Sequence, residues 1–329
     1  MAVTLSLAYS MRRMLRTNNL VRKMHACETM GATTVICTDK TGTLTQNQMR
    51  VAETAFFGLP DQKLANNAAS RLIETAIAVN STAQLDLSDP ERPTVLGNPT
   101  EGALLLWMRA AGVDYRAIRE SAKVVRELPF TTERKYMATV IAEPDGRERL
   151  FVKGAPEIVL ALSSSVSGGV SRDKIEELLL GYQRKAMRTL GFATCVLPAG
   201  AEGIGEKGVE APELEFMGVV AIADPVRADV PDAIRECLDA GIAIKIVTGD
   251  TPATAMEIGR QIGLWTDADG DRNIITGPEF GALTDSELLD RVLDLKIIAR
   301  ARPLDKKRLV EALQANNCLL YTSDAADEL

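Results

Sequence analysis

Short apolar runs that end in polar residues recur along the chain. Those richest in β-branched residues are Thr34–Asp39, Met217–Asp224, Ile242–Asp250 and Leu295–Arg300. Such runs, separated by helical stretches, are typical of buried strands in a parallel sheet. Because ligands bind beyond the carboxyl ends of these strands, we expect the charged residues that close the runs to gather at one edge. They are Asp39, Asp224, Asp250 and Arg300.

Helical patterns and turn residues fill the intervals between these runs. Helices are predicted from Asp229 to Gly241, from Asp250 to Gly263 and over Leu309–Gln314. Roughly 160 residues separate the first run from the others, which is enough for a domain. Within this insert the patterns predict helices at 64–79, 98–112 and 173–188, a hairpin of 136–142 with 149–152, and a strand at 190–197. The predicted fold is therefore α/β, a doubly wound parallel sheet with a large inserted α+β domain.

Charge and composition narrow the chemistry. The 329 residues include 38 Lys and Arg against 45 Asp and Glu, a net charge of −7, so we expect no nucleic acid partner. A single His and five scattered Cys argue against a His-cluster metal site or a disulfide framework. No apolar run reaches the roughly 18 residues of a membrane helix. A catalytic site here would work with carboxylates, lysines and backbone amides.

The two ends of the chain differ from the rest. Met1–Tyr9 is apolar and is followed by basic residues beginning at Arg12 and Arg13. This order suits either the last turns of a membrane helix emerging on the cytoplasmic side or an amphipathic surface helix. Residues 319–329 show no periodicity, and we assign them no function.

The segment Asp39-Lys40-Thr41-Gly42-Thr43-Leu44-Thr45 directly follows the first predicted strand. A carboxylate in this position can attack a phosphoryl group, because the loop after it turns its backbone N–H groups toward the transferring oxygens. Gly42 allows close approach, and the Thr43 hydroxyl can bind a phosphate oxygen. The residues themselves therefore predict a phosphoryl-transfer site.

This segment resembles the phosphorylation signature of the P-type ATPases, ion pumps built on the haloacid-dehalogenase-like fold. The resemblance implies that Asp39 is phosphorylated by ATP, that the Thr41 carbonyl binds Mg²⁺ and that Thr43 contacts the phosphate. Soluble phosphatases of this fold carry a second Asp two positions after the nucleophile, as acid and base. Because Thr41 stands there, we expect the acyl phosphate to hydrolyse slowly.

Three further motifs occur in the family's order. Thr248-Gly249-Asp250 resembles the second phosphate motif, in which Thr248 and Gly249 contact phosphate oxygens and Asp250 lies near the nucleotide. Asp224-Pro225-Val226-Arg227 resembles the segment where the insert rejoins, with Asp224 and Arg227 near the ribose and phosphates. The segment Arg300–Lys306 resembles the loop whose lysine, here Lys306, neutralises the phosphoryl group. We expect the adjacent Lys307 and Arg308 to be solvated.

The insert contains residues that match the family's nucleotide pocket. They are Glu101, Phe130, Lys135, Lys153, Gly154 and Arg188. By resemblance Phe130 stacks on adenine with Lys135 beside it, and Lys153 lines the adenine cavity. Gly154 lets the base lie against the backbone, Glu101 is the pocket's acidic residue, and Arg188 reaches toward the phosphates. Taken singly, Phe130 is equally typical of a core residue and Glu101 of a helix start.

The resemblance predicts four segments: the end of a membrane helix and stalk (1–31), a phosphorylation domain (32–51 with 214–318), a nucleotide-binding domain (52–213) and an unassigned tail (319–329). It implies the core of an ATP-driven cation pump that forms an aspartyl phosphate from Mg²⁺ and ATP. Similarity of Met1–Gly31 to plasma-membrane-type calcium pumps makes Ca²⁺ the expected cation, ahead of Na⁺/K⁺ or protons. The expected location is the cytoplasmic face of an integral membrane protein, with the fragment itself soluble.

Some family features are missing, and two other functions stay open. The Gly-Asp-Gly-Val-Asn-Asp segment with the second Mg²⁺ carboxylate, the ion-binding helices and the Thr-Gly-Glu loop are not in this sequence. We therefore expect the chain alone to bind ATP weakly and to be poorly phosphorylated. We also expect closure of the insert about hinges near residues 51 and 214. The alternatives are a soluble haloacid-dehalogenase-like phosphohydrolase and a non-catalytic nucleotide-binding module.

Overall fold

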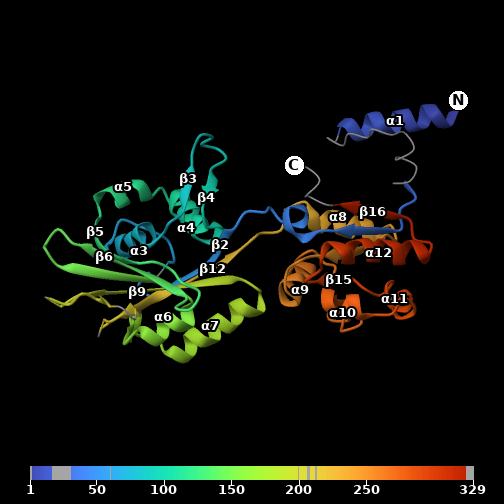
Figure 1. The fold of residues 1–329 in the computed structure, drawn as a ribbon. Helices are drawn as coiled ribbons and strands as arrows, with labels where there is room; N and C mark the ends of the chain where they lie inside the picture. Colours follow the sequence, from blue (N-terminus) through green and yellow to red (C-terminus); the bar gives the residue numbers. More distant parts are fainter. Residues whose placement is uncertain are drawn as a thin grey trace. The chain divides into compact units, whose positions relative to one another are not determined.

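A computed structural model describes residues 2–16, 31–59, 61–198, 200–205, 208–211 and 213–323. The chain divides into two compact units, each drawn in Figure 1. We call residues 1–47 with 226–329 the discontinuous unit, and residues 48–225 the inserted unit. The chain thus leaves the first unit once and returns to it once.

The discontinuous unit is built on a parallel sheet. Its described strands are β1 (Val35–Thr38), β13 (Ala243–Val247), β14 (Ile274–Thr276), β15 (Ile297–Ala299) and β16 (Leu320–Ser323). They lie in the order β14-β15-β13-β1-β16, and every neighbouring pair is parallel. Three of the four strands predicted from apolar runs are confirmed as β1, β13 and β15. The predicted tail also contributes the edge strand β16, while residues 324–329 lie outside the described residues.

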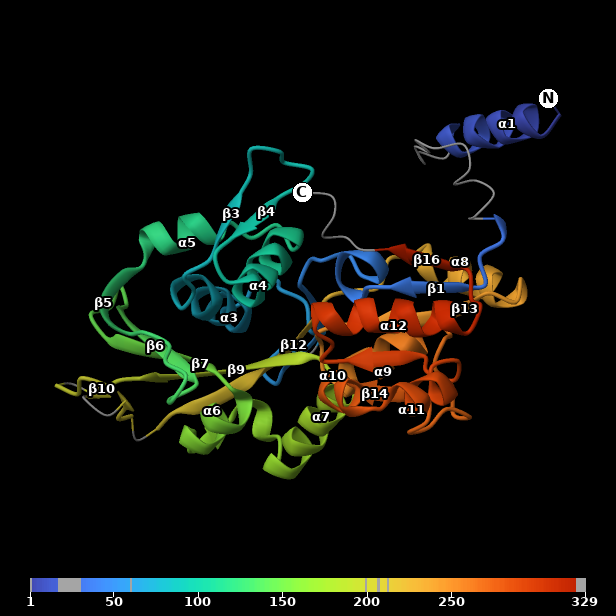
Figure 2. The same ribbon diagram turned by 45° about the vertical axis from the view of Figure 1, so that its right-hand side comes forward.

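Helices cover both faces of this sheet. Helices α8 (Val230–Asp239) and α9 (Pro252–Gln261) pack on one face, against Ile244 and Ile246. The other face holds α10 (Gly277–Ala282), α11 (Asp285–Arg291) and α12 (Pro303–Ala315), as Figure 2 shows. The three predicted helices of this region are confirmed. Their caps explain the boundaries, since Thr251 accepts a hydrogen bond from the amide of Thr254 at the start of α9.

The run Met217–Asp224 forms a strand of a different sheet. It is β12 (Glu215–Ala223), which pairs antiparallel with β2 (Arg50–Phe56) and with β9 (Arg188–Val196) in the inserted unit. The prediction of a parallel strand at this position was wrong. An antiparallel strand covered by helices on both faces shows the same continuous apolar run as a buried parallel one. The strands β2 and β12 pair along their length, and both lie in the inserted unit 48–225. The bounds of 52–213 for a nucleotide-binding domain stay a prediction.

The inserted unit has a mainly antiparallel sheet. Its strands lie in the order β2-β12-β9-β7-β6-β5, and β8 pairs with β12. The strands not yet bounded are β5 (Lys123–Leu128), β6 (Tyr136–Ala142), β7 (Glu148–Gly154) and β8 (Ser165–Val166). Two short hairpins lie outside it: β3 (Gln84–Asp86) with β4 (Thr94–Leu96), and β10 (Ile204–Gly205) with β11 (Gly208–Val209). The predicted hairpin is confirmed as β6 and β7, whereas β5 was not predicted.

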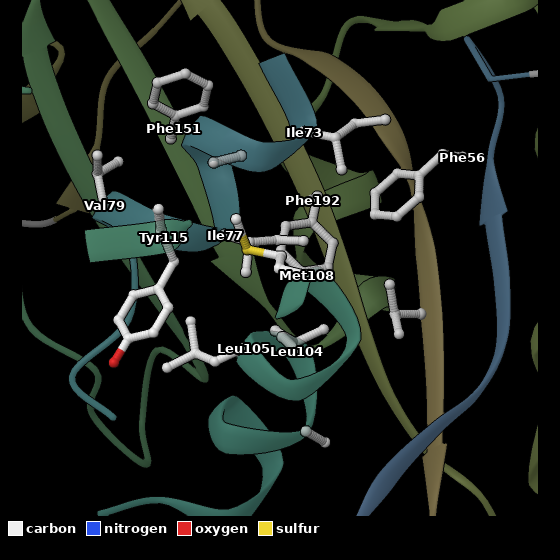
Figure 3. Close-up of a cluster of buried hydrophobic side chains, with 14 of the residues drawn as sticks. Phe56, Ile73, Ile77, Val79, Leu104, Leu105, Met108, Tyr115, Phe151 and Phe192 are labelled. Atoms are coloured by element: carbon white, nitrogen blue, oxygen red, sulfur yellow. The ribbon is translucent and has the colours of Figure 1, made fainter. Parts of the chain in front are cut away.

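Five helices described in this unit flank its sheet. Helices α3 (Ala68–Val79), α4 (Pro99–Ala110) and α5 (Tyr115–Ser121) enclose one core with Phe56, Phe151 and Phe192 from the strands. Figure 3 shows part of that cluster. Helices α6 (Pro156–Leu162) and α7 (Arg172–Arg184) enclose a second core on the opposite face. The helix predicted at 173–188 ends at Arg184 because β9 already begins at Arg188.

The N-terminal segment forms helix α1 (Ala2–Arg16). None of the helices in the described part of the chain is both long and apolar enough to cross a bilayer. The predicted stalk beyond α1 falls largely on residues 17–30, which lie outside the described residues. Both interpretations of the N-terminus therefore stay predictions.

A buried lysine of β13 binds the segment that follows α11. Lys245 is 2% exposed, and its Nζ donates to the carbonyls of Val292 (2.8 Å), Leu293 (3.1 Å) and Leu295 (2.5 Å). Burial lowers the pKa of Lys245 to about 8, although the nearby Cys37, Cys318 and Asp294 act to raise it. Because its ordinary pKa is 10.5, the folded state binds fewer protons than the unfolded state between those two values. The contribution of Lys245 to stability therefore rises with pH across that window.

This predicts a pH-dependent effect of Lys245→Met. The free energy of unfolding of the wild type minus that of the variant should rise by about 2 kcal/mol between about pH 7.5 and 9.5. Burial raises the pKa of Cys37 to about 11, but this opposing contribution is present in both proteins. Urea unfolding at each pH measures the difference, and exposed Lys307→Met is the control. A difference that stays flat with pH would contradict the prediction.

Candidate functional site

Asp39 begins a tight turn at the carboxyl end of β1. Its Oδ1 accepts a hydrogen bond from the Lys40 amide (2.6 Å), and the turn Lys40–Leu44 follows. Gly42 has φ +78°, which glycine adopts without strain, and the Thr45 amide closes the turn on the Lys40 carbonyl (3.1 Å). The turn therefore holds the carboxylate at the end of an inner strand of the sheet, as the motif predicts.

Two lysine–carboxylate pairs meet at this edge. Lys306 of α12 donates from Nζ to Asp39 Oδ2 at 3.0 Å. Lys40 Nζ lies 2.5 Å from Asp250 Oδ2, with Lys40 buried and Asp250 about one-third exposed. The structure thus brings together three sequence-predicted residues, Asp39, Asp250 and Lys306, from segments far apart in the chain.

The remaining predicted residues of this unit surround those pairs. Thr248 is buried, and its Oγ1 accepts from the Asp250 amide (3.2 Å). The exposed Arg300 has φ +51°, and its amide donates to the Asp250 carbonyl (2.8 Å). Gly249 has open space where a Cβ would stand, so packing does not require glycine there. Thr41 is exposed and Thr43 half-buried within the Asp39 turn.

Arg227 braces the Asp39 turn through its backbone. The guanidinium donates from Nη2 to the Gly42 carbonyl (2.5 Å) and from Nε to the Thr45 carbonyl (3.2 Å), while the Arg227 amide donates to Leu44 (3.0 Å). Its predicted place near the ribose and phosphates stays a prediction. Asp224 follows β12 in the inserted unit and accepts from the Gln48 amide (3.1 Å). Asp224 therefore does not follow a strand of the parallel sheet, and its predicted place near the nucleotide stays a prediction.

In the inserted unit, Glu101 and Lys153 form a buried ion pair. Glu101 lies in the first turn of α4 and Lys153 on β7; they are 6% and 3% exposed, and Lys153 Nζ lies 2.7 Å from Glu101 Oε1. The other carboxylate oxygen accepts from the Thr82 amide (2.8 Å), the Thr82 hydroxyl (2.9 Å) and the Ala83 amide (3.2 Å). Lys153 also donates to the Asn80 carbonyl.

The pKa values of this pair reflect burial and mutual attraction. Burial alone raises the pKa of Glu101, but Lys153 and the hydrogen bonds from Thr82 outweigh it, so the value lies below its ordinary range. Burial lowers the pKa of Lys153 despite the attraction of Glu101, and the nearby Arg119 lowers it further. Removing either partner would leave an uncompensated buried charge.

Of the other predicted pocket residues, Phe130, Lys135 and Arg188 lie nearer the surface, whereas Gly154 is buried. Phe130 is 55% exposed in the segment between β5 and β6, and Lys135 and Arg188 are also exposed. Arg188 Nη1 donates to Thr100 Oγ1 (3.4 Å), beside Glu101 at the start of α4. A Cβ on Gly154 would come within 2.4 Å of the Lys135 carbonyl oxygen, so close strand packing itself requires glycine there.

Sequence reasoning missed the loop that holds Glu101 and Lys153. Residues 80–83, between α3 and β3, supply the Asn80 carbonyl and the amides of Thr82 and Ala83. Main-chain groups leave no residue-type signal. The only visible clue is a pair of polar hydroxyl residues, Ser81 and Thr82, directly after the helix.

Comparison with known proteins defines the class to which these sites belong. Residues 68–229 match the family model described as P-type ATPase, cytoplasmic domain N. Similar proteins align along nearly the whole chain.

The similar proteins are calcium-transporting ATPases. Calcium-transporting ATPase PAT1 of Dictyostelium discoideum is 38% identical over 95% of this chain and 29% of its own length. Plasma membrane calcium-transporting ATPase 3 of Homo sapiens is 36% identical over 95% and 28%. Calcium-transporting ATPase 10, plasma membrane-type, of Oryza sativa subsp. japonica is 35% identical over 100% and 34%. The chain spans about a third of the length of these relatives.

The buried pair predicts a large effect of Lys153→Met on stability. Loss of the ammonium group leaves the buried Glu101 carboxylate without its countercharge. The free energy of unfolding, measured by urea denaturation, should therefore fall by about 3 kcal/mol. The control Lys185→Met breaks the surface pair with Glu53 and should cost about 1 kcal/mol or less. The double variant Glu101→Gln/Lys153→Met should lose less than the two single losses added together. Equal effects at positions 153 and 185 would contradict the prediction.

Proposed function

We propose that this chain forms the catalytic core of an ATP-driven cation pump, with Ca²⁺ as the transported cation. The observation that carries the proposal is the Asp39 carboxylate at the end of β1, paired with Lys306 at 3.0 Å. The names of the similar calcium-transporting ATPases support Ca²⁺. The proposal extends to a full-length protein in the membrane whose cytoplasmic face carries these units.

The proposed chemistry is phosphoryl transfer to Asp39. An Asp39 carboxylate oxygen attacks the γ-phosphorus of ATP, the new O–P bond forms, the bond to the β–γ bridging oxygen breaks, and ADP leaves with that electron pair. Lys306 then stabilises negative charge on the transferring oxygens. In this role Thr43, Thr248 and Gly249 contact the phosphate.

Magnesium fits this site as a partner of the nucleotide. The described residues contain no cluster of three or more metal-binding side chains of His, Cys, Asp or Glu. Mg²⁺ is commonly held by one or two carboxylates together with substrate phosphates and water, and Asp39 with the Thr41 carbonyl suits that arrangement. When bound, Mg²⁺ would neutralise charge on the phosphates.

We propose that the inserted unit binds the adenine nucleotide. Phe130 is more than half exposed and offers its ring face for stacking, while the exposed Lys135 and Arg188 supply positive charge for phosphates. Glu101, Lys153 and Gly154 would form the base of this pocket. We also propose that four further residues lie near the nucleotide. They are Asp224, just before the chain re-enters the discontinuous unit, and Arg227, Asp250 and Arg300 within that unit.

A soluble phosphohydrolase is not favoured. Such an enzyme needs an acid and base close to its nucleophile, and the position two residues after Asp39 is Thr41. The related proteins are transporters by name. A long-lived aspartyl phosphate suits a pump, in which another domain controls its hydrolysis.

The phosphorylation proposal predicts label at Asp39. We would place residues 32–318 in the aligned segment of human plasma membrane calcium-transporting ATPase 3 and incubate the chimera with radiolabelled ATP and Mg²⁺. Acid-stable, hydroxylamine-sensitive label should appear, and Asp39→Asn should abolish it. Lys306→Met should slow labelling at least about 100-fold because a fixed cation at the phosphoryl group is lost, whereas exposed Lys307→Met should not.

The outcome separates the proposed roles. Label that persists in the Asp39→Asn chimera would refute the nucleophile. Absence of label in a folded chimera that binds ATP would refute phosphoryl transfer to this chain. Equal labelling rates in the Lys306→Met and Lys307→Met chimeras would refute only the role of Lys306.

The nucleotide proposal predicts weaker binding by Phe130→Ala. Loss of one stacking ring should raise the Kd for ATP about tenfold, measured by calorimetry on this chain. The matched control is Leu96→Ala, because Leu96 is similarly exposed in the same unit. An unchanged Kd in Phe130→Ala would show that this ring does not contact the base.

A further inference from the structure

Arg119 is the most heavily engaged arginine of the inserted unit that lies outside the predicted site. It projects from α5, and its guanidinium donates to three backbone carbonyls: Ala78 (2.6 Å, from Nε), Ala83 (3.0 Å, from Nη1) and Ser81 (2.9 Å, from Nη2). Its Cζ also lies 4.8 Å from the centre of the Tyr115 ring. Thus one guanidinium nitrogen binds the last turn of α3 and the other two bind the loop 80–83 that follows it.

The same loop holds the buried ion pair from its other side. Its Thr82 and Ala83 amides bind Glu101, and the Asn80 carbonyl binds Lys153. Arg119 therefore fixes the carbonyls of the loop, while Glu101 is fixed by its amides. The Ser81 carbonyl and the Thr82 amide belong to one planar peptide group, so Arg119 on that carbonyl also sets the direction of an amide that binds Glu101.

The end of α3 makes this arrangement favourable. Ala78 lies in the last turn of α3, where carbonyls have no partner within the helix and carry partial negative charge. A planar guanidinium presents donors from three separate nitrogens in a fixed arrangement, whereas all donors of an ammonium group diverge from one nitrogen. No carboxylate pairs with Arg119 among the ion pairs of the described residues, so its partners are these carbonyls and the Tyr115 ring.

We propose that Arg119 is a positioning residue for the nucleotide site of the inserted unit, holding residues 78–83 in the conformation that fixes Glu101 and Lys153. This inference rests on the proposed function, because it assumes that nucleotide binds beside that pair. Arg119 itself would not contact the nucleotide. Its loss would let the loop move, displace both charged groups and weaken binding.

The test compares Arg119→Met with a matched variant on the same helix. Arg116→Met is the control, because Arg116 donates to the Leu85 carbonyl (2.5 Å) beyond the loop. Calorimetry with ATP gives Kd for each chain, and hydrogen exchange followed by NMR gives the amide exchange rates of Thr82 and Ala83. The amide of Val140, in buried β6, reports global opening.

We expect Arg119→Met to raise Kd for ATP about tenfold and to speed exchange at Thr82 and Ala83 at least about tenfold, with Val140 unchanged. Arg116→Met should leave Kd within about twofold of wild type. Arg119→Lys should fall between, since a single ammonium nitrogen replaces three guanidinium nitrogens that each bind a different carbonyl. It replaces the Met variant should that variant not fold. A Lys variant with wild-type Kd and wild-type exchange would overturn the inference.

Two failures can be told apart. No ATP binding by the wild-type chain would refute the nucleotide site and the inference with it. Normal wild-type binding, together with an Arg119→Met variant whose Kd or loop exchange matches wild type, would refute the positioning role and leave the proposed function standing.

Discussion

The discontinuous unit depends on the neutralisation of two carboxylates at one edge of its sheet. Asp39 and Asp250 follow neighbouring parallel strands, so their charges approach one another. Lys306 and Lys40 each pair with one of them, and one of these lysines comes from a helix more than 260 residues along the chain. Without those cations the two negative charges would repel each other across the edge. The same two ion pairs also connect the end of β1 to α12 and to the segment after β13.

Three strands of this unit's sheet, β1, β13 and β15, could be predicted because each is a short apolar run that ends in polar residues. It failed at β12 for a physical reason: helices cover both faces of that strand, so Val219, Val220 and Ala221 are all buried, as in a parallel strand. Pairing direction depends on partners distant in sequence, here β2 and β9, and no local pattern encodes it.

The sites were partly predictable for a related reason. Charged side chains such as Asp39, Lys306, Glu101 and Lys153 can be recognised from motifs, but their backbone partners cannot. Arg308 was expected to be solvated, and this was wrong: it donates to Phe280 (2.8 Å) and Leu283 (2.6 Å) at the end of α10. Arg172 likewise binds Leu160 (2.8 Å) near the end of α6. Helix carbonyls without internal partners are present at every helix end, whatever the sequence, so only the fold reveals which arginine reaches them.

Burial divides the candidate nucleotide residues into two groups with different physical roles. The charged groups of Glu101 and Lys153 bind each other and the loop 80–83. Both side chains are buried, so little of their surface is accessible to a ligand. Phe130, Lys135 and Arg188 are exposed, so a nucleotide would displace mainly their hydration and, for Arg188, its 3.4 Å hydrogen bond to Thr100. Binding energy should therefore come chiefly from the exposed group, whereas the buried pair and its loop set the shape against which the nucleotide is held. Substitutions of Glu101 or Lys153 should therefore change nucleotide affinity by altering the shape of the site, and they should also lower folding stability. Substitutions of the exposed residues should change affinity without a comparable loss of stability.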